Sequence, residues 1–289
     1  MKRRDFLLHA TALPFAGAFL RVPLTGDDDE SLCSKKFERA VSLGLRKQPI
    51  GDVVVAMGET FLGTDYLAHA LEVPGEERLV VNMSGLDCVS FYENALVLAR
   101  CIKLNILTFA DYKKQLQYIR YRGGVLDGYL SRLHYTTDYV FDNVKKKVWK
   151  DVTEEIGGVP FAPAVNFMST HPDSYRQLRE HPELVEGMRK IESEIAARKK
   201  FHVPKDKVEG IQGKIHDGDI LGITTDIEGL DTSHTGVAVR QHGSLFMMHA
   251  PITGKKVQIT ERTLSEYLAG NKRQTGIIVA RPLEPERAE

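Results

Sequence analysis

The spacing of apolar residues changes along this chain, from mostly helical in the first two thirds to short strand-like runs in the last third. Strand-like segments separated by polar turns fill that last third: "GDILGITT", "HTGVAVR", "SLFMMHAP", "KKVQIT" and "TGIIVARP". One helix is predicted among them, at "TLSEYLAG". Helices followed by consecutive strands predict an α+β fold with an antiparallel sheet or barrel.

Cys88 stands where a short polar turn meets a long helix-like run, in "SGLDCVSFYENALVLAR". The apolar positions of this run that recur at three- and four-residue steps are Val89, Tyr92, Leu96, Ala99 and Ile102. They predict a core helix that begins near Cys88 and ends near Lys103. A thiol at a helix N-terminus lies at the positive end of the helix dipole, so we expect a lowered pKa and a nucleophile. A buried core cysteine is the alternative, and a nearby base would decide between them.

The segment "SHTGVAVRQHGSLFMMHAP" predicts a hairpin that carries histidines. If Arg240 pairs with Leu245 across a turn at 242–243, alternation puts His234 and His249 on one face, about 7 Å apart. One imidazole could then orient the other, with His242 at the turn. Two strand histidines that only satisfy local hydrogen bonds remain the alternative.

These residues suggest the chemistry of a cysteine hydrolase. Cys88 would attack, His234 would take and return the proton, and His249 would hold the His234 ring. A zinc site fits less well, because the histidines lack the spacing of a helical HExxH motif.

The order of motifs closely resembles the NlpC-type papain-like superfamily of cell-wall hydrolases and, within it, the N-acetylmuramoyl-L-alanine amidase-like family. The matching motifs are Tyr66 in "FLGTDYLAHALE", Asp87-Cys88, "GDILGI", His234 in "SHTGVAV" and His249 in "FMMHAP". The resemblance spans about residues 35–285 and includes "YRGGVLDGYLSRLHYTTDYVFDN" and "FHVPKDK". It implies a papain-like fold with Cys88, His234 and His249 as catalytic residues and Tyr66 as a donor to the oxyanion. One departure, Val89-Ser90 where many members have Ser-Gly, concerns the shape of the adjoining pocket.

A single catalytic domain is expected over residues 35–289, with a largely helical, family-specific insertion at 105–204. Four residues of "YLSRLHYTTDY" are predicted to line the substrate cleft: Ser131, Arg132, His134 and Tyr135. Arg132 is the favoured one, because its fork could hold a peptide carboxylate. A solvated loop is the alternative for each of them. Asp219 in "GDI" is predicted to be a turn residue.

Residues 1–18 resemble an export signal, with Arg3-Arg4 typical of a twin-arginine signal and an ordinary Sec signal as the alternative. Residues 19–34 are predicted to be a mobile linker. Removal of 1–18 takes three basic residues and one acidic residue from 39 of each, which leaves a net charge of −2. This charge excludes a general attraction to nucleic acid, and no mature segment is predicted to span a membrane. Three cysteines, Cys33, Cys88 and Cys101, leave at least one free thiol.

The sequence therefore predicts an exported, periplasmic cysteine amidase that cleaves the N-acetylmuramoyl-L-alanine bond of peptidoglycan fragments, without a metal or organic cofactor. An endopeptidase that cuts further along the stem peptide, for example after D-glutamate, is one alternative. A noncatalytic cell-wall binding module is the other.

Overall fold

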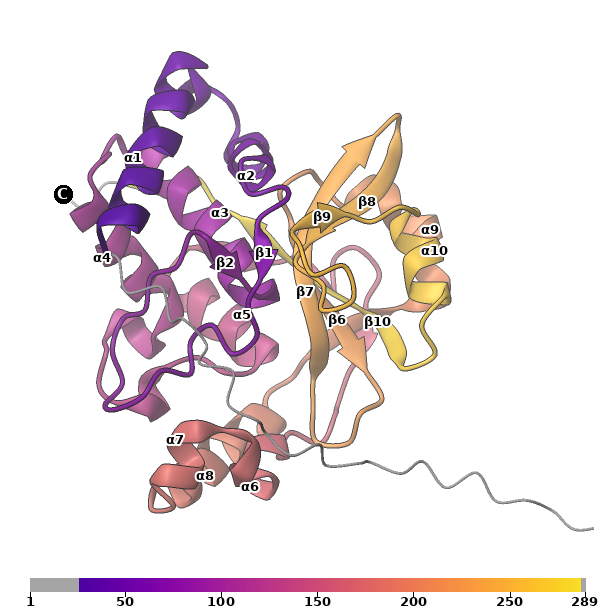
Figure 1. Ribbon diagram of the computed structural model, residues 1–289. Coiled ribbons are helices and arrows are strands. Elements are labelled where there is room, and N and C mark those ends of the chain that lie inside the picture. The colour runs from indigo at the N-terminus through magenta and orange to yellow at the C-terminus, as the bar shows by residue number, and fades with distance from the viewer. Residues whose placement is uncertain (1–25, 287–289) are drawn as a thin grey trace, which may run out of the picture.

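The computed structural model describes residues 26–286, which form a helical half packed against an antiparallel sheet (Figure 1). The helices are α1 (Gly26–Ser42), α2 (Ile50–Glu59), α3 (Cys88–Leu104), α4 (Phe109–Arg120), α5 (Thr136–Lys145), α6 (Phe167–Thr170), α7 (Arg176–Glu180), α8 (Leu184–Ala197), α9 (Val208–Ile211) and α10 (Leu264–Ala269). The strands are β1 (Asp65–Tyr66), β2 (Gly85–Leu86), β3 (Trp149–Asp151), β4 (Val159–Pro160), β5 (Phe201–Pro204), β6 (Ile220–Thr225), β7 (Thr232–Gln241), β8 (Ser244–His249), β9 (Gln258–Ile259) and β10 (Gln274–Pro282). Among these described helices, none is both long and apolar enough to cross a membrane.

The main sheet runs in the order β4-β5-β10-β6-β7-β8-β9, and β3 also pairs with β10. Alternation along β7 sends Val237 and Val239 into the core shared with α1 to α5, and Ala238 into a second core on the opposite face. Figure 1 shows α9 and α10 on that opposite face. The sheet is thus buried on both sides, which explains why its strands are almost continuously apolar.

The register of the β7–β8 hairpin is the predicted one. Arg240 pairs with Leu245, and the turn is formed by His242 and Gly243, whose φ angles are 50° and 83°. Two successive positive φ angles are typical of a tight hairpin turn that matches the twist of the strands. The register places the end of β8 beside the start of β7, where His249 and His234 lie.

Helix α3 confirms the predicted core helix and begins at Cys88. Asp87 accepts a hydrogen bond from the Ser90 backbone N–H, and the Ser90 hydroxyl returns to the Asp87 backbone N–H, a reciprocal cap at 2.7 and 2.9 Å. The helix ends at Asn105, which adopts a left-handed conformation. This cap fixes the point at which the chain turns into the helix, and therefore the position of the thiol.

The predicted strands of the last third and the helix at 264–269 are all present. One prediction before Cys88 is wrong. A strand is expected at "ERLVV", but no strand forms at these residues in the described structure. The segment 63–72, expected as a short helix or turn, has turns at 68–71 and also contains β1. β1 pairs in parallel with β2, the two-residue strand immediately before Asp87. A two-residue strand has too little periodicity to be visible in a sequence.

The predicted mobile linker is wrong for residues 26–34, which belong to α1. Cys33 is fully buried, and the Asp29 carboxylate accepts a hydrogen bond from the Met83 backbone N–H at 2.8 Å. Acidic residues in the first turn also favour a helix, because negative charge is stabilised at the positive end of the helix dipole. The predicted export signal at 1–18 lies outside the described residues.

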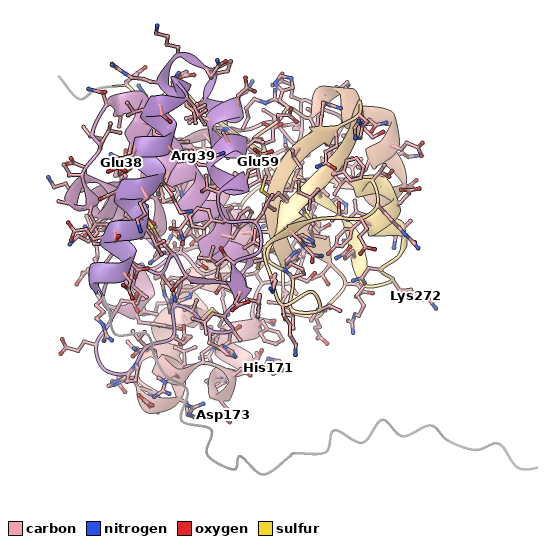
Figure 2. All side chains as sticks on the ribbon, turned by 45° about the horizontal axis from the view of Figure 1, so that its top comes forward. Glu38, Arg39, Glu59, His171, Asp173 and Lys272 are labelled. Carbon is pink, nitrogen blue, oxygen red and sulfur yellow. The ribbon has the colours of Figure 1, made fainter. Side chains whose placement is uncertain are left out.

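The region 105–204, predicted as a largely helical insertion, contributes helices and strands to the central fold. Helices α4 and α5 contribute to the core around α3, while β3 and β5 pair with β10 in the main sheet. Only α6 to α8 gather around a smaller core of their own, and Figure 2 shows His171 and Asp173 at the outer edge of that unit. Much of the predicted insertion is therefore part of the central fold.

Candidate active site

Cys88 lies at the first position of α3, and the residue as a whole is half-buried. The thiol has Thr235 of β7 beside it, and it also influences the phenols of Tyr66 and Tyr267 electrostatically. Three segments far apart in the sequence thus converge on the helix N-terminus. Cys33 and Cys101 are buried free thiols away from this cluster.

The predicted low pKa of Cys88 is not found in this structure. Burial raises the pKa of the thiol to about 11, and the Asp87 carboxylate adds to the rise, while the hydroxyl and backbone of Thr235 oppose it. The Thr235 hydroxyl oxygen is buried and makes no hydrogen bond within the described part of the chain. The resting Cys88 thiol is therefore neutral near pH 7, since desolvation outweighs the helix terminus.

His234 and His249 are in direct contact, as the hairpin register predicts. Nε2 of His234 lies 2.7 Å from Nδ1 of His249, and the two rings meet at 72° with their centroids 5.0 Å apart. A β-bulge lies next to His234, because Ile223 pairs with His234 while Thr224 pairs with Thr232. Bulges commonly bend a strand beside an active site and redirect a side chain.

Both imidazoles are neutral near pH 7. Burial lowers the pKa of His234 to about 4, and burial together with the proximity of His234 lowers the pKa of His249 to about 3. With Nε2 of His234 engaged by His249, Nδ1 is the remaining nitrogen of the His234 ring. No direct hydrogen bond between Cys88 and His234 occurs among the described residues, and such bonds are often loose without substrate.

Tyr66 reaches the thiol because β1 is tied to both halves of the molecule. It pairs with Leu86, two residues before Cys88, and its backbone N–H donates to the carbonyl of Lys255 at 2.7 Å. Burial raises the pKa of the Tyr66 phenol to about 12, and the nearby Cys88 and Asp87 contribute. Tyr66 is consequently a neutral O–H donor near the nucleophile.

Two residues of this cluster were missed by sequence reasoning. Tyr267 of α10 packs against His249 with the rings at 88° and the centroids 5.5 Å apart, and Thr235 lies beside Cys88. A tyrosine in "TLSEYLAG" carries no motif, so only the packing of α10 on the sheet reveals it. A threonine in a strand carries no motif either, so only the packing of α3 on β7 places Thr235 beside Cys88.

Arg132 does not fit the predicted role in substrate binding. It is 4% exposed, its guanidinium forms ion pairs with Glu72 and Glu77 at 2.5 and 3.4 Å, and it donates to the carbonyl of Leu71. The guanidinium carbon of Arg132 also lies 4.9 Å from the centroid of the Tyr129 ring. Arg132 therefore holds the segment 71–77 in place, and its charge is already balanced.

The other predicted cleft residues are also engaged in local contacts. The Ser131 hydroxyl donates to the carbonyl of Gly128 at 2.7 Å, and Nε2 of His134 lies 3.1 Å from the carbonyl of Tyr129. The Tyr135 hydroxyl donates to Glu192 at 2.6 Å in the core around α8. These contacts engage the three residues locally, and their place in the substrate cleft stays a prediction.

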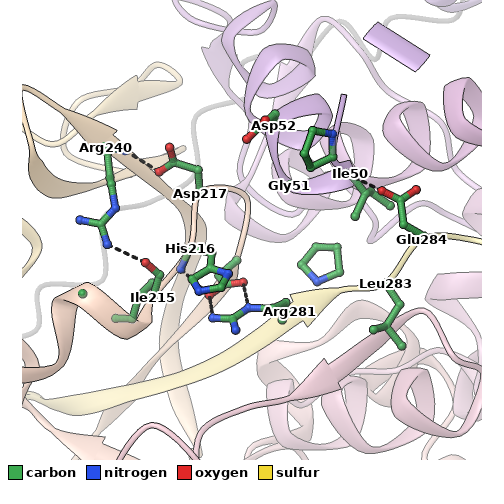
Figure 3. A pocket seen from close by; sticks show the side chains of 14 residues that line it. Ile50, Gly51, Asp52, Ile215, His216, Asp217, Arg240, Arg281, Leu283 and Glu284 are labelled. Carbon is green, nitrogen blue, oxygen red and sulfur yellow. Dashed lines mark hydrogen bonds and ion pairs between the residues drawn. The ribbon is translucent and has the colours of Figure 1, made fainter. Parts of the chain in front are cut away.

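A pocket of about 560 Å³ lies between the start of α2 and the ends of β7 and β10 (Figure 3). Arg240, which lines it, is six residues beyond His234, so the pocket is about 20 Å from the histidine pair along the strand. Asp219, the predicted turn residue, pairs there with Arg281 at 2.8 Å. Within residues 26–286 no cluster of three or more His, Cys, Asp or Glu side chains is arranged for a metal.

Comparisons with known proteins agree over most of the chain. A family model described as N-acetylmuramoyl-L-alanine amidase-like matches residues 56–277. A solved N-acetylmuramoyl-L-alanine amidase from Bacteroides uniformis is 37% identical with a TM-score of 0.77, covering 81% of this chain and 98% of that chain. A "putative xylanase" from Bacteroides fragilis is 38% identical with a TM-score of 0.75, covering 78% and 99%. A Legionella pneumophila protein at 20% identity shares the fold, with a TM-score of 0.69 and coverage of 90% and 96%. No curated protein matches.

Proposed function

The chain belongs to the N-acetylmuramoyl-L-alanine amidase-like family, and from this premise we propose that it is a cysteine amidase that hydrolyses the amide between N-acetylmuramic acid and L-alanine in peptidoglycan fragments. The observation that supports this proposal is one constellation: Cys88 at the start of a capped helix, with Tyr66 near it and His234 held by His249 at 2.7 Å. The same constellation suggests the papain-like superfamily as the wider relationship.

The reaction begins from neutral groups. As the sulfur of Cys88 attacks the carbonyl carbon, Nδ1 of His234 accepts the thiol proton, while Nε2–H of His234 donates to Nδ1 of His249. The raised thiol pKa and the lowered imidazole pKa mean that proton transfer accompanies the attack instead of preceding it. Cys88 in this state acts like a serine nucleophile that depends on its base.

The tetrahedral oxyanion requires donors. The backbone N–H at the start of α3 and the hydroxyl of Tyr66 are the donors that the site offers. Collapse of the intermediate breaks the carbon–nitrogen bond, and His234 returns its proton to the leaving amine of L-alanine. Water, deprotonated by His234, then hydrolyses the thioester and restores the Cys88 thiol.

Cleavage of a glycosidic bond, which the description of the Bacteroides fragilis protein suggests for that protein, is less well supported here. Such enzymes usually place two carboxyl groups on either side of the bond. Asp87, the carboxylate beside Cys88, is occupied by the cap of α3 and accepts from both the backbone and the hydroxyl of Ser90. The amide chemistry of a thiol and an imidazole is the better explanation of this site.

The proposal includes export to the periplasm through residues 1–18, by the twin-arginine or the Sec route, and independence of any metal or cofactor. A fusion of residues 1–34 to a reporter that is active only outside the cytoplasm tests export. In strains lacking one of the two pathways, the signal should fail only where its own pathway is missing.

Mass spectrometry of purified muropeptides digested with the protein tests the bond. The expected products are the disaccharide and the intact stem peptide beginning with L-alanine, with unchanged yield in a chelator. The Cys88→Ser protein is the control and should give neither product. A disaccharide that retains L-alanine and D-glutamate would instead identify an endopeptidase, and cleavage by Cys88→Ser would exclude the thiol mechanism.

A further inference from the structure

A second pocket, of about 1150 Å³, lies at the end of α3 that is remote from Cys88. It is bordered by α3, α4, the end of α5 and the segment 283–286. Arg100, which lines the pocket, is twelve residues beyond Cys88, so the two sites are about 18 Å apart along the helix. Figure 3 shows Leu283 and Glu284, which border both this pocket and the one near α2.

The buried charge of this pocket is Arg100. Its side chain is 5% exposed, Nε donates to the Gln115 side-chain carbonyl at 3.1 Å, and its guanidinium carbon lies 6.0 Å from the centroid of the Tyr118 ring. Nη1 is buried and makes no hydrogen bond in the described part of the chain. Burial lowers the pKa of the Arg100 guanidinium, the direction expected for a cation without a counter-ion.

Two other arginines of the same helical half are buried to a similar degree, and both have carboxylate partners. Arg120 is paired with Glu93 at 2.7 Å, and Arg132 is paired with Glu72 at 2.5 Å. A buried cation is costly unless an anion and hydrogen bonds compensate it. Arg100 has only a neutral amide and an aromatic ring as polar neighbours among residues 26–286, so its remaining N–H groups lack an anion.

The other charges around the pocket are already balanced. Lys146 pairs with Asp142 at 2.6 Å and also donates to backbone carbonyls. Glu284 pairs with Lys103 at 3.2 Å and accepts from the Ile50 backbone N–H at 2.9 Å. Lys147 pairs with Glu286 at 3.7 Å. Among the described residues that line this pocket, the uncompensated charge is therefore positive.

We propose that this pocket is a second binding site, which takes the terminal carboxylate of a short peptide on Arg100. A guanidinium can bind a carboxylate through two parallel hydrogen bonds. The pocket is larger than an inorganic ion needs, and Leu104, Ile106 and Tyr118 provide an apolar wall for the rest of the ligand. The site does not depend on the proposed amidase reaction, because it shares no residue with the cluster around Cys88.

Calorimetric titration of the Cys88→Ser protein with N-acetyl-L-alanyl-D-alanine tests the site, with the C-terminal amide of the same peptide and inorganic phosphate as further probes. We expect the carboxylate peptide to bind, and the amide and phosphate to bind at least tenfold more weakly. Introducing Arg100→Met into the Cys88→Ser protein should weaken peptide binding at least tenfold. Adding Arg39→Met should change nothing, because Arg39 is exposed on α1 (Figure 2).

Three results would overturn the site: equal binding of acid and amide, binding of phosphate alone, or binding that survives Arg100→Met. Thermal unfolding distinguishes loss of the binding site from a defect of the fold. Because Arg100→Met removes an unbalanced buried charge, its unfolding midpoint should equal or exceed that of the parent protein. If Arg100→Met lowers the midpoint and the parent protein shows no binding that depends on Arg100, the role of Arg100 is structural alone. Arg100→Met in the Cys88-intact enzyme should hydrolyse muropeptides normally, so failure of the amidase proposal would be seen separately.

Discussion

Nε2 of His234 lies 2.7 Å from Nδ1 of His249, so one buried imidazole holds the other in a single orientation. Because both rings are neutral near pH 7, a shared proton must sit on one of the two nitrogens. If it sits on Nε2 of His234, the lone pair of Nδ1 is free to accept the proton of Cys88. The proposed mechanism requires this tautomer, because only then can His234 act as a general base.

Alkylation of Cys88 should report a high thiol pKa. Because burial raises this pKa to about 11, the rate with iodoacetamide should be low near pH 7 and should still be rising above about pH 9. Peptide mapping against pH measures it, with the fully buried Cys33 and Cys101 as slower internal controls. A rate that is already constant below pH 7 would mean that the resting site is a thiolate paired with an imidazolium.

Replacement of the base should be far more damaging than replacement of another histidine of the same hairpin. His234→Gln should lower kcat by about 10²- to 10⁴-fold, since glutamine cannot accept and return the thiol proton. His242→Asn is the matched control and should keep full activity, because His242 is exposed in the turn and asparagine tolerates its positive φ of 50°. Equal losses in both variants would point to a defect of the hairpin.

His249 should behave as a positioning residue. His249→Gln should keep much of the activity because its amide can still bond to Nε2 of His234, whereas His249→Ala should lose about 10- to 100-fold in kcat. The measurement is steady-state kinetics with a pH profile for each variant. If alanine and glutamine behave alike, the contact at 2.7 Å does not orient the base.

The histidine pair should make the fold less stable in acid. The folded pKa values of about 4 and 3 lie below the usual value of 6.5, so the unfolded chain binds more protons between about pH 6.5 and 4. Stability should therefore fall as the pH drops through this window, by on the order of 2 kcal/mol between pH 7 and 5 after allowance for the partial exposure of His234. Urea unfolding at both pH values measures it. In the His234→Gln/His249→Gln double variant, this part of the pH dependence of stability should disappear. An unchanged pH dependence would contradict the lowered pKa values of the two histidines.

Arg132 should prove to be a stabilising residue. Arg132→Ala leaves Glu72 and Glu77 without their buried counter-charge and should lower the free energy of unfolding by about 3–5 kcal/mol. Arg189→Ala, which removes an exposed pair on α8, should cost less than about 1 kcal/mol. Arg132→Lys keeps the charge and tests substrate binding. A KM that rises for peptides with a free carboxylate, without loss of stability, would return Arg132 to the cleft.

The sequence alone determined those features of the fold that depend on short-range spacing. Short apolar runs between Gly and polar turns predicted β6 to β8 and β10. The turn at His242 and Gly243 set the hairpin register, and three- and four-residue steps predicted α3. The register also predicted that His234 and His249 meet, because register fixes which side chains share a face, and the two rings are in contact.

Only the tertiary structure decided how these groups ionise and which charges are free. Burial reversed the pKa expected for Cys88, and Glu72, sixty residues before Arg132, removed that arginine from the cleft. Tyr66 reached the site through two-residue strands, and Tyr267 reached it through the packing of α10. Desolvation and ion pairing depend on neighbours that are distant in sequence, and local spacing carries no information about them.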